Sequence, residues 1–258
     1  MTKLYTRDIS SSLSDRIGQL YKQEVEHIKQ VRLSDILRQA DGYFLAFKRV
    51  ALLDQFVREG IDRAILPTEQ KLFHRLLVDL SLFVCERTHR GWKSSFTGIG
   101  LEFRAGKTHY LVSVKSRPNW GNSQQITAMK REFNKAKRIL RTNAPGRKIV
   151  AICACCYGRD NKPDKGEYLN LCGQRFWEFI SGNENLYTEI IEPLGHRARE
   201  RNEQFAEAYA QIINKFTIEF AKDFCEEDGK INWEKLVKFN SSKEPSDVRS
   251  GRRKGRTT

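Results

Sequence analysis

The stretch GLEFRAGKTHYLVSVKSRPNWGNSQQ, residues 100–125, decides the fold that the sequence predicts. GIGLEF, residues 98–103, alternates apolar with other residues, which is typical of a strand with one buried face. HYLVSVKS, residues 109–116, alternates in the same way, and the RAGK segment between the two runs favours a hairpin turn. The stretch therefore predicts two neighbouring antiparallel strands followed by a loop rich in Pro, Asn, Trp and Gly.

An acid and a lysine lie inside these two apolar runs. In the first run, the period of two predicts one apolar face made of Ile99, Leu101 and Phe103. Glu102 falls on the other face, and in the second run Ser113 and Lys115 fall together with Leu111. If the strands pair antiparallel, Glu102 shares a side with Ser113 and Lys115. Charges in such a setting need a partner or a chemical role that offsets their desolvation.

A helix and a third strand follow the loop. Residues 122–142 predict a strongly amphipathic helix that Asn122 or Ser123 caps. Its apolar stripe is Ile126, Met129, Phe133, Ala136 and Leu140. Its polar side is basic, with Lys130, Arg131, Lys135, Lys137, Arg138 and Arg141. KIVAICACCYG, residues 148–158, then reads as a buried strand, so the order strand–strand–helix–strand predicts an α/β protein with a mixed sheet flanked by helices.

Further helices surround this core. Helical spacing predicts a helix over residues 10–31 and a second over 34–60 that is interrupted near Gly42. LPTEQ, residues 66–70, predicts a restart with Thr68 as the cap of a third helix that ends near Thr88. GQRFWEFISG, residues 173–182, and residues 197–226 predict two more. The inward positions of the last helix are Phe205, Tyr209, Ile212, Ile213, Phe216 and Phe220.

We expect residues 1–245 to form a single domain with its core at about residues 69–158, and residues 246–258 to form a basic disordered tail. Lys and Arg number 46 against 32 Asp and Glu, a formal charge of +14 that points to nucleic acid as partner. No run approaches the roughly 20 apolar residues of a membrane span, and the N-terminal residues lack a secretory signal. The sequence thus predicts a cytoplasmic protein without a membrane partner.

The six cysteines are expected to be reduced thiols. Three of them lie in the apolar run at 148–158, where free Cys acts as a small buried hydrophobe. The alternative is a zinc site that combines Cys155 or Cys156 with Cys172. The spacing lacks the CxxC pairs of zinc ribbons and fingers, so burial is the favoured interpretation.

Glu102, Ser113 and Lys115 together can form a phosphodiester-cleaving site. A carboxylate can hold Mg²⁺, which offsets phosphate charge and lowers the pKa of a bound water. A nearby lysine can orient that water or stabilise the transition state. Asp79 falls on the stripe Leu72, Leu76, Asp79, Phe83 and Glu86 of the third helix. There it either faces a cation or serves as an auxiliary acid.

At these residues the chain resembles the PD-(D/E)xK nuclease superfamily, and more closely the Type II restriction endonucleases. Glu102 matches the first acid, and SVK, residues 113–115, matches the acid-x-Lys segment. The stretches YLVSVKSRPNWGNSQQ, residues 110–125, and CGQRFWEFISGNENLYTEIIEPLG, residues 172–195, resemble a restriction-enzyme group labelled PmeII-like. The resemblance covers about residues 69–158 for the superfamily and extends almost to the C-terminus for the group.

The resemblance implies a Mg²⁺-dependent endonuclease that cuts double-stranded DNA at a short palindrome and leaves 5′-phosphate and 3′-hydroxyl ends. In its length and in these two stretches, the chain also resembles one enzyme of this class whose target is GCGC. A methyltransferase with the same target would be a functional partner, not a physical one.

This chain departs from the superfamily pattern at both acids. No Pro-Asp precedes the first strand, where Glu102 replaces the usual Asp, and Ser113 replaces the second acid. Because a hydroxyl is a weak metal ligand, another group must complete the shell of a metal at Glu102. The candidates are the Val114 carbonyl, Asp79, Glu86 and Gln124.

Residues near the predicted site are candidates for DNA contacts. Those placed to meet phosphates are Lys93, Arg117, Lys130 and Arg131. In the loop after the second strand, Asn119, Trp120, Asn122 and, at the start of the helix, Gln124 can approach bases, although Trp120 can equally anchor the loop in the core. The candidates for major-groove readout are Arg159, Asn161, Lys162 and Lys165.

Three alternatives stay open at this point. Glu102 and Lys115 can form only an ion pair in a hairpin. The chain can be a catalytically silent nucleic-acid-binding protein in which Ser113 marks a decayed site. It can also be a repair or structure-specific nuclease on the same fold.

Overall fold

The computed structural model describes residues 6–48, 52–143, 145–195 and 198–243, and their side chains except those of residues 6–7 and 198–202. The predicted tail, residues 246–258, lies outside the described residues. The described chain divides into two compact units. One unit contains the described residues up to Leu20 together with Lys71–Ala198, and the other contains Tyr21–Gln70 together with the described residues from Arg199 onward.

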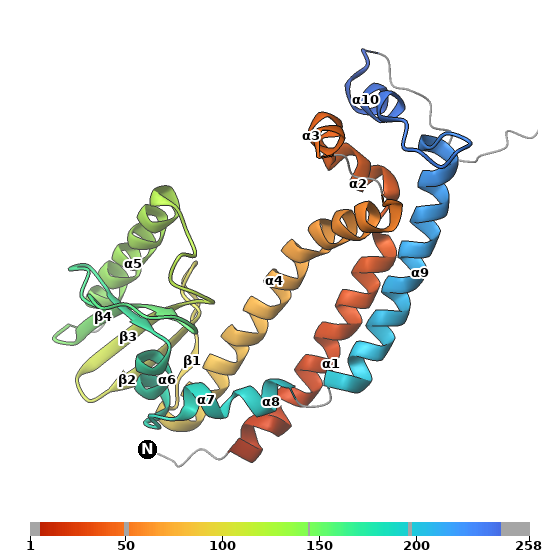
Figure 1. Cartoon of the computed structure of the whole chain (residues 1–258). Helices are drawn as coiled ribbons and strands as arrows, with labels where there is room; N and C mark the ends of the chain where they lie inside the picture. Colours follow the sequence, from red (N-terminus) through yellow and green to blue (C-terminus); the bar gives the residue numbers. More distant parts are fainter. Residues whose placement is uncertain (1–5, 49–51, 144, 196–197, 244–258) are drawn as a thin grey trace, which may run out of the picture. The chain divides into compact units, whose positions relative to one another are not determined.

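The first unit is built on a five-stranded mixed sheet in the order β1-β2-β3-β4-β5 (Figure 1). The strands are β1 (Trp92–Lys93), β2 (Leu101–Ala105), β3 (Thr108–Lys115), β4 (Lys148–Cys155) and β5 (Leu169–Cys172). Pairing is antiparallel from β1 to β3 and parallel from β3 to β5. The predicted α/β class, a mixed sheet flanked by helices, is therefore confirmed, although β1 and β5 were not predicted.

The hairpin of β2 and β3 forms as the sequence predicts. β2 ends at Ala105 and β3 begins at Thr108, and Gly106 in the turn has a φ of +57°, which glycine adopts without strain. Glu102 pairs with Leu111, and so it shares a face with Leu111, Ser113 and Lys115.

The predicted placement of Ile99 is wrong. Ile99 lies before β2 and packs in the apolar cluster of Leu111, whereas Leu101 pairs with Val112 on the opposite face. The reason is that the chain turns before the strand, because the Ile99 amide donates to the Phe96 carbonyl. The alternation of a pleated strand therefore begins only at Leu101.

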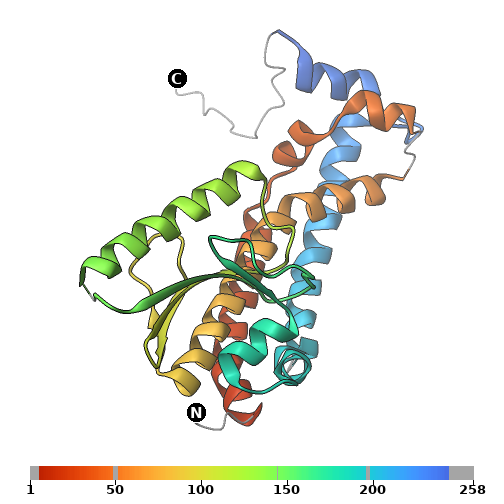
Figure 2. The ribbon, with the colours of Figure 1, turned by 90° about the vertical axis from the view of Figure 1, so that its left-hand side faces the viewer.

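Helix α5 (Ser123–Asn143) covers one face of the sheet, and α4 and α6 cover the other (Figure 2). The α5 side packs through the predicted stripe, with Met129, Phe133 and Ala136 buried. Its N-terminus is closed by a reciprocal cap, in which Asn122 accepts from the Gln125 amide at 3.0 Å and Gln125 accepts from the Asn122 amide at 2.9 Å. Asn122 is thus the cap that the sequence predicts.

On the opposite face, aromatic rings join the sheet to α6 (Gln174–Ser181). The Phe179 ring lies 5.5 Å from that of Phe103 and 5.2 Å from that of Tyr110. Thr88, near the end of α4, donates from its hydroxyl to the Ile180 carbonyl at 2.6 Å. This bond ties α6 to α4 and satisfies one of the last carbonyls of α6.

The predicted restart at residues 66–70 is wrong. α4 runs without interruption over Leu53–His89, and Pro67 lies inside it. Proline removes one amide donor from a helix interior, and α4 nevertheless extends over 37 residues. The boundary between the two units nevertheless falls three residues later, after Gln70.

The second unit is helical. Its elements are parts of α1 (Thr6–Gln30), α4 and α9 (Ala198–Phe224), and the whole of α2 (Leu33–Gln39), α3 (Gly42–Phe47) and α10 (Trp233–Ser241). Its core includes Val57, Ile61, Ile213, Phe216 and Phe220, so the inward face predicted for the long C-terminal helix is confirmed. Two short helices of the first unit, α7 (Leu186–Glu189) and α8 (Ile191–Gly195), precede α9. Across the ranges described, no helix combines the length and apolar content that crossing a membrane requires.

Carboxyl groups gather on one part of the helical unit. Burial, and then the charge of Glu69, raise the pKa of Glu24 from 4.5 to about 7. Burial and then the charge of Asp62 raise the pKa of Glu69. The charge of His27 lowers this pKa and so offsets part of the rise. Asp62 in turn accepts a hydrogen bond from the Tyr209 hydroxyl at 2.5 Å. Each additional negative charge in this cluster therefore destabilises the others.

Replacing Glu24 removes a pH-dependent loss of stability. The folded state holds the Glu24 proton up to about pH 7, whereas the unfolded chain releases it near pH 4.5. Stability linked to this group is therefore fully present below pH 4.5 and is lost as the pH rises toward 7. We expect Glu24→Gln, measured by urea unfolding, to gain about 1–2 kcal/mol over the wild type at about pH 8 and little below pH 4.5, with allowance for partial exposure.

The matched control is Glu26→Gln, because Glu26 lies exposed on the same helix. It should leave the pH dependence of unfolding unchanged. An equal gain from Glu24→Gln at acidic and alkaline pH would contradict the assignment.

Candidate active site

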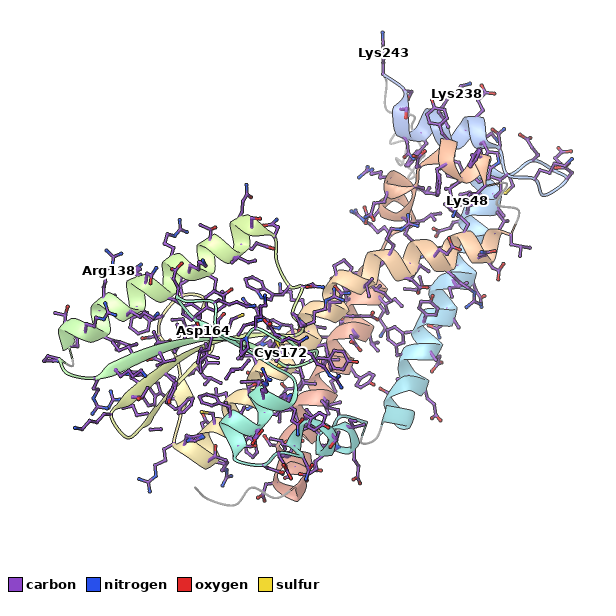
Figure 3. The ribbon with its side chains drawn as sticks, turned by 60° about the vertical axis from the view of Figure 1, so that its left-hand side comes forward. Lys48, Arg138, Asp164, Cys172, Lys238 and Lys243 are labelled. Carbon is purple, nitrogen blue, oxygen red and sulfur yellow. The ribbon has the colours of Figure 1, made fainter. Side chains whose placement is uncertain are left out.

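The three parallel strands end together at one edge of the sheet. Lys115, the last residue of β3, pairs with Cys155 at the end of β4, which pairs with Cys172 at the end of β5. Figure 3 labels Cys172 at this edge. The carboxyl ends of parallel strands are where ligands bind in open α/β sheets, because the loops that follow leave room there.

Lys115 is the charged residue of this edge. Its ammonium nitrogen lies 4.1 Å from the centroid of the Trp120 ring, a cation–π contact. Burial lowers the pKa of Lys115, and the neighbouring thiols of Cys153 and Cys155 oppose this effect only in part. Trp120 also packs on the apolar cluster beneath α5, so it anchors its loop in the core.

A histidine from α4 completes the surroundings of Lys115. His74 Nδ1 lies 3.1 Å from the hydroxyl oxygen of Ser116, and Ser116 is the residue that follows Lys115 in the chain. Burial and then the positive charge of Lys115 lower the pKa of His74. The imidazole is therefore neutral at neutral pH and can accept a proton.

Glu102 is engaged in a buried pair of its own. His109 Nε2 lies 2.8 Å from a carboxylate oxygen of Glu102, and both side chains are almost fully buried. Burial lowers the pKa of His109, although the bond with Glu102 opposes this effect. The edge of His109 also meets the Trp92 ring. The carboxylate of Glu102 therefore has a structural partner.

The strand register separates Glu102 from Lys115. Glu102 stands opposite Leu111, four residues before Lys115, which is about 13 Å at roughly 3.3 Å per residue. Its carboxylate turns toward His109, in the direction away from Lys115. Among the described residues no ion pair joins Glu102 and Lys115, so the two share a face without meeting.

Ser113 lies between them on the same face. Its side chain is fully buried, and its neighbour on β4 is Cys153. Val114 points its side chain to the opposite face and pairs with Ala154. The predicted acid-x-Lys segment thus presents one hydroxyl and one ammonium on the α5 side.

The stripe predicted for the third helix is wrong. The buried positions of this part of α4 are Leu76, Leu77, Leu80, Ser81, Val84, Cys85 and Thr88. Asp79 is partly exposed and pairs with Arg16 of α1 at 2.9 Å, and Glu86 is exposed. Asp79 therefore faces a cation, the first of the two interpretations of this residue.

No cluster of metal-binding side chains forms among the described residues. Mg²⁺ takes hard oxygen ligands, usually from one or two carboxylates. Glu102, Asp79 and Glu86 do not converge, and in the described part of the chain no three or more His, Cys, Asp or Glu side chains are grouped so that they could hold a metal ion. Neither the expected Mg²⁺ shell nor a zinc site is assembled from these residues.

The cysteines near Lys115 pack as apolar groups. Cys153, Cys155 and Cys172 belong to the cluster beneath α5, and the Cys155 sulfur lies 3.7 Å from the Asn170 side-chain oxygen. A hydrogen bond from Cys155, and to a smaller extent the charge of Lys115, lower the pKa of Cys153. All described cysteines are free thiols.

Comparison with known protein families identifies the family of this chain. A family model described as Type II restriction endonuclease EcoO109I matches residues 7–202, well over half of the chain. This chain belongs to the Type II restriction endonuclease EcoO109I family. No curated protein matches it. Membership supports a sequence-specific endonuclease with double-stranded DNA as substrate. It does not support the finer resemblance to the PmeII-like group or to the enzyme whose target is GCGC.

In a restriction endonuclease of this family, exposed cations and amides near the site are candidates for DNA contacts. Most of the predicted ones are exposed, namely Lys93, Arg117, Asn119, Asn122, Gln124, Arg131, Arg159, Asn161, Lys162 and Lys165. Figure 3 shows Arg138 on the outer side of α5, which carries the predicted basic row. The structure therefore leaves these side chains accessible to a DNA ligand.

Three lysines near the site also make contacts within the protein. Lys130 bonds to Glu167 at 2.9 Å, and Lys137 donates to the Glu167 carbonyl at 2.6 Å. Lys165 pairs with Asp160 at 2.9 Å. The two contacts of Glu167 attach the loop before β5 to α5, and the Lys165–Asp160 pair lies within that loop. All three contacts compete with phosphate for the same ammonium groups.

Sequence reasoning did not find His109 and His74. His109 could have been found from the hairpin, because a turn at residues 106–107 places it on the face of Glu102. His74 gave no local signal, since its contact with Ser116 spans 42 positions of the chain.

The Glu102–His109 pair should show strong energetic coupling. His109→Leu leaves a buried carboxylate unpaired and should cost about 3–5 kcal/mol, whereas Glu102→Leu leaves a neutral donor and should cost about 1–3 kcal/mol. The double variant should cost clearly less than the sum, as measured by denaturant unfolding in a double-mutant cycle. Additive single costs would show that the two side chains do not interact.

Proposed function

We propose that this protein is a Type II restriction endonuclease that hydrolyses both strands of DNA at a short palindrome. The observation that carries the proposal is Lys115 at the carboxyl ends of the parallel strands, in a chain that belongs to a restriction endonuclease family. Water attacks phosphorus, the bond to the 3′ oxygen breaks, and the products are 5′-phosphate and 3′-hydroxyl ends. Residues 1–245 act as one nuclease, in the cytoplasm, beside a methyltransferase that protects the same sequence.

Lys115 is the residue proposed to act on the scissile phosphate. Its ammonium group, held over Trp120, is placed to stabilise the charge that develops on the phosphate oxygens. Because burial lowers its pKa, Lys115 is also closer to proton exchange than an exposed lysine. His74 is a neutral base next to this amine and can accept a proton through Ser116.

Type II restriction endonucleases generally use Mg²⁺, and the proposal includes this requirement. When bound, the ion neutralises phosphate charge and activates water. Glu102, Ser113, Val114, Asp79 and Glu86 are the candidates that the sequence offers for its protein ligands, and the structure does not bring these residues together. The separation of these groups gives no basis for a step that depends on them.

Plasmid cleavage tests the activity. With Mg²⁺ we expect discrete fragments whose ends share one palindrome, with GCGC as the first candidate, and no cleavage in EDTA. DNA ligase should rejoin the fragments, because it requires 5′-phosphate and 3′-hydroxyl ends. Cleavage confined to flaps or mismatches would instead indicate a repair nuclease.

Lys115→Ala should lower the cleavage rate by about 100-fold or more while DNA binding persists, because a group aimed at the transition state is removed. Lys115→Met keeps the apolar stem over Trp120 and should behave in the same way. The matched control is Lys107→Ala, an exposed lysine in the hairpin turn at the other end of β3. Full cleavage by both Lys115 variants would overturn the site.

A second function is favoured by a specific observation. Glu102 is bonded to His109, and Ser113 occupies the position of an acid, which suits a DNA-binding protein that does not cleave. Tight binding of duplex DNA without cleavage in Mg²⁺ would establish this function and reject the first.

A further inference from the structure

A cavity of about 620 Å³ opens beside the candidate active site, at the carboxyl ends of β4 and β5. We call it the tyrosine cavity, and its walls include Tyr157, Arg159, Arg175, Tyr187 and Ile191. Cys172, labelled in Figure 3, also lines it. This volume lies in the range of pockets that hold small ligands.

Backbone bonds connect the cavity to the strand that carries Lys115. The Cys156 amide donates to the Lys115 carbonyl at 2.8 Å, and the Tyr157 amide donates to the Ser116 carbonyl at 3.0 Å. The rim of the cavity is thus continuous with the edge where the phosphate is proposed to be cut.

Three large apolar side chains are exposed around this one cavity. Tyr157 is 78% exposed, Ile191 68% and Tyr187 40%. Single exposed apolar residues are ordinary on protein surfaces, but several that line the same concave site indicate a ligand with an apolar face. Tyrosine rings supply flat faces at a small cost in conformational entropy.

Two arginines give the cavity its charge. Arg159 and Arg175 both line it, and Arg175 donates from Nη1 to the Asp160 carbonyl at 3.2 Å. This bond uses one of the five donors of a guanidinium and fixes the side chain at the rim. Aromatic faces combined with guanidinium groups suit a base joined to a phosphate.

The walls are held in place by the loop that ends at β5. Asp160 accepts from the Asn170 side chain at 2.5 Å and from the Lys162 amide at 2.8 Å, and it pairs with Lys165. These bonds, the one with Asn170 first, lower the pKa of Asp160 to about 2, so it stays charged at neutral pH. The loop that carries Arg159 is therefore held by several bonds to Asp160.

The two sides of the cavity also approach each other closely at their base. Gly173 has a φ of +54°, and a Cβ atom there would lie 2.6 Å from the Gly158 carbonyl oxygen. Any side chain at this position would push the two loops apart. The backbone contact keeps the arginine-bearing loop next to the start of α6.

We propose that the tyrosine cavity receives one DNA nucleotide that is unstacked from the duplex. Its base lies against Tyr157 and Tyr187, and its phosphate meets Arg159 and Arg175. Inside a duplex the faces of a base are covered by its neighbours, so tyrosine rings in a cavity can stack only on a base that has left the helix or is unpaired. This inference rests on the proposed function, because that function makes DNA the ligand.

The test compares two DNA ligands in EDTA, so that no cleavage occurs. One is a short duplex, and the other is the same duplex with one unpaired nucleotide at its centre. We expect the wild type to bind the second more tightly, because an unpaired base leaves the helix at lower cost. Tyr157→Ala and Tyr187→Ala should each reduce this preference by about tenfold or abolish it, as measured by fluorescence anisotropy.

Two further variants separate the roles of the side chains. Arg175→Gln should weaken binding of both duplexes by a similar factor, because phosphate contacts do not depend on base pairing. Tyr43→Ala is the matched control, since Tyr43 is 73% exposed on α3 and does not line the cavity. It should leave both affinities unchanged.

Equal affinity of the wild type for the two duplexes would overturn the inference, and so would a preference that survives both tyrosine substitutions. Failure of the proposed function shows itself differently, as the absence of cleavage in the plasmid experiment. A preference for the unpaired nucleotide in a protein that does not cleave would support the cavity and reject the nuclease. Binding of neither duplex would also overturn the inference, and the plasmid experiment alone would then decide the nuclease.

Discussion

The parallel pairing of β3 with β4 is the constraint on which the first unit depends. Parallel neighbours cannot be joined by a tight turn, so the chain must cross over the sheet, and α5 makes this crossing. The crossing buries the apolar stripe of α5 and leaves its basic side outward. It also brings the ends of β3, β4 and β5 to one edge, where Lys115 and the tyrosine cavity lie next to each other.

The sheet contains two polar arrangements with different surroundings, one at each end of β3. Near the hairpin, Glu102 and His109 satisfy each other inside the core. At the opposite end of β3, Lys115 has an aromatic ring and thiols as neighbours, which offer less compensation for its charge. A phosphate group would supply that compensation, and for this reason we propose that DNA binds at this end.

Much of the fold followed from residues 98–158, because each element there carries its own periodic pattern. The capped helix, the second strand of the hairpin and the strand KIVAICACCYG lie where their patterns place them, whereas the first strand begins at Leu101 and not at residue 98. β1 and β5, with two and four residues, are too short to show a period, and their pairing is set by the neighbouring strands. Pro67 signals a helix boundary locally, yet α4 continues through it.

The candidate site was less predictable for a related reason. Alternation assigns Glu102, Ser113 and Lys115 to one face, but the distance along that face depends on the register, which the hairpin turn sets. The partner of Asp79 could not be found from α4 alone, because Arg16 lies 63 positions earlier in the chain. Spacing in sequence therefore identified the face of the site and not its contacts.

The anchoring of Glu167 has a consequence for the ionic strength at which this protein would meet DNA. Of the six cations on the polar side of α5, Lys130 and Lys137 are bonded to Glu167, and Arg131 lies 3.6 Å from Glu132. Each lysine or arginine that contacts a phosphate releases about 0.9 condensed counterion from duplex DNA. Cations already satisfied within the protein release fewer, so binding through this helix would tolerate added salt better than its six charges suggest.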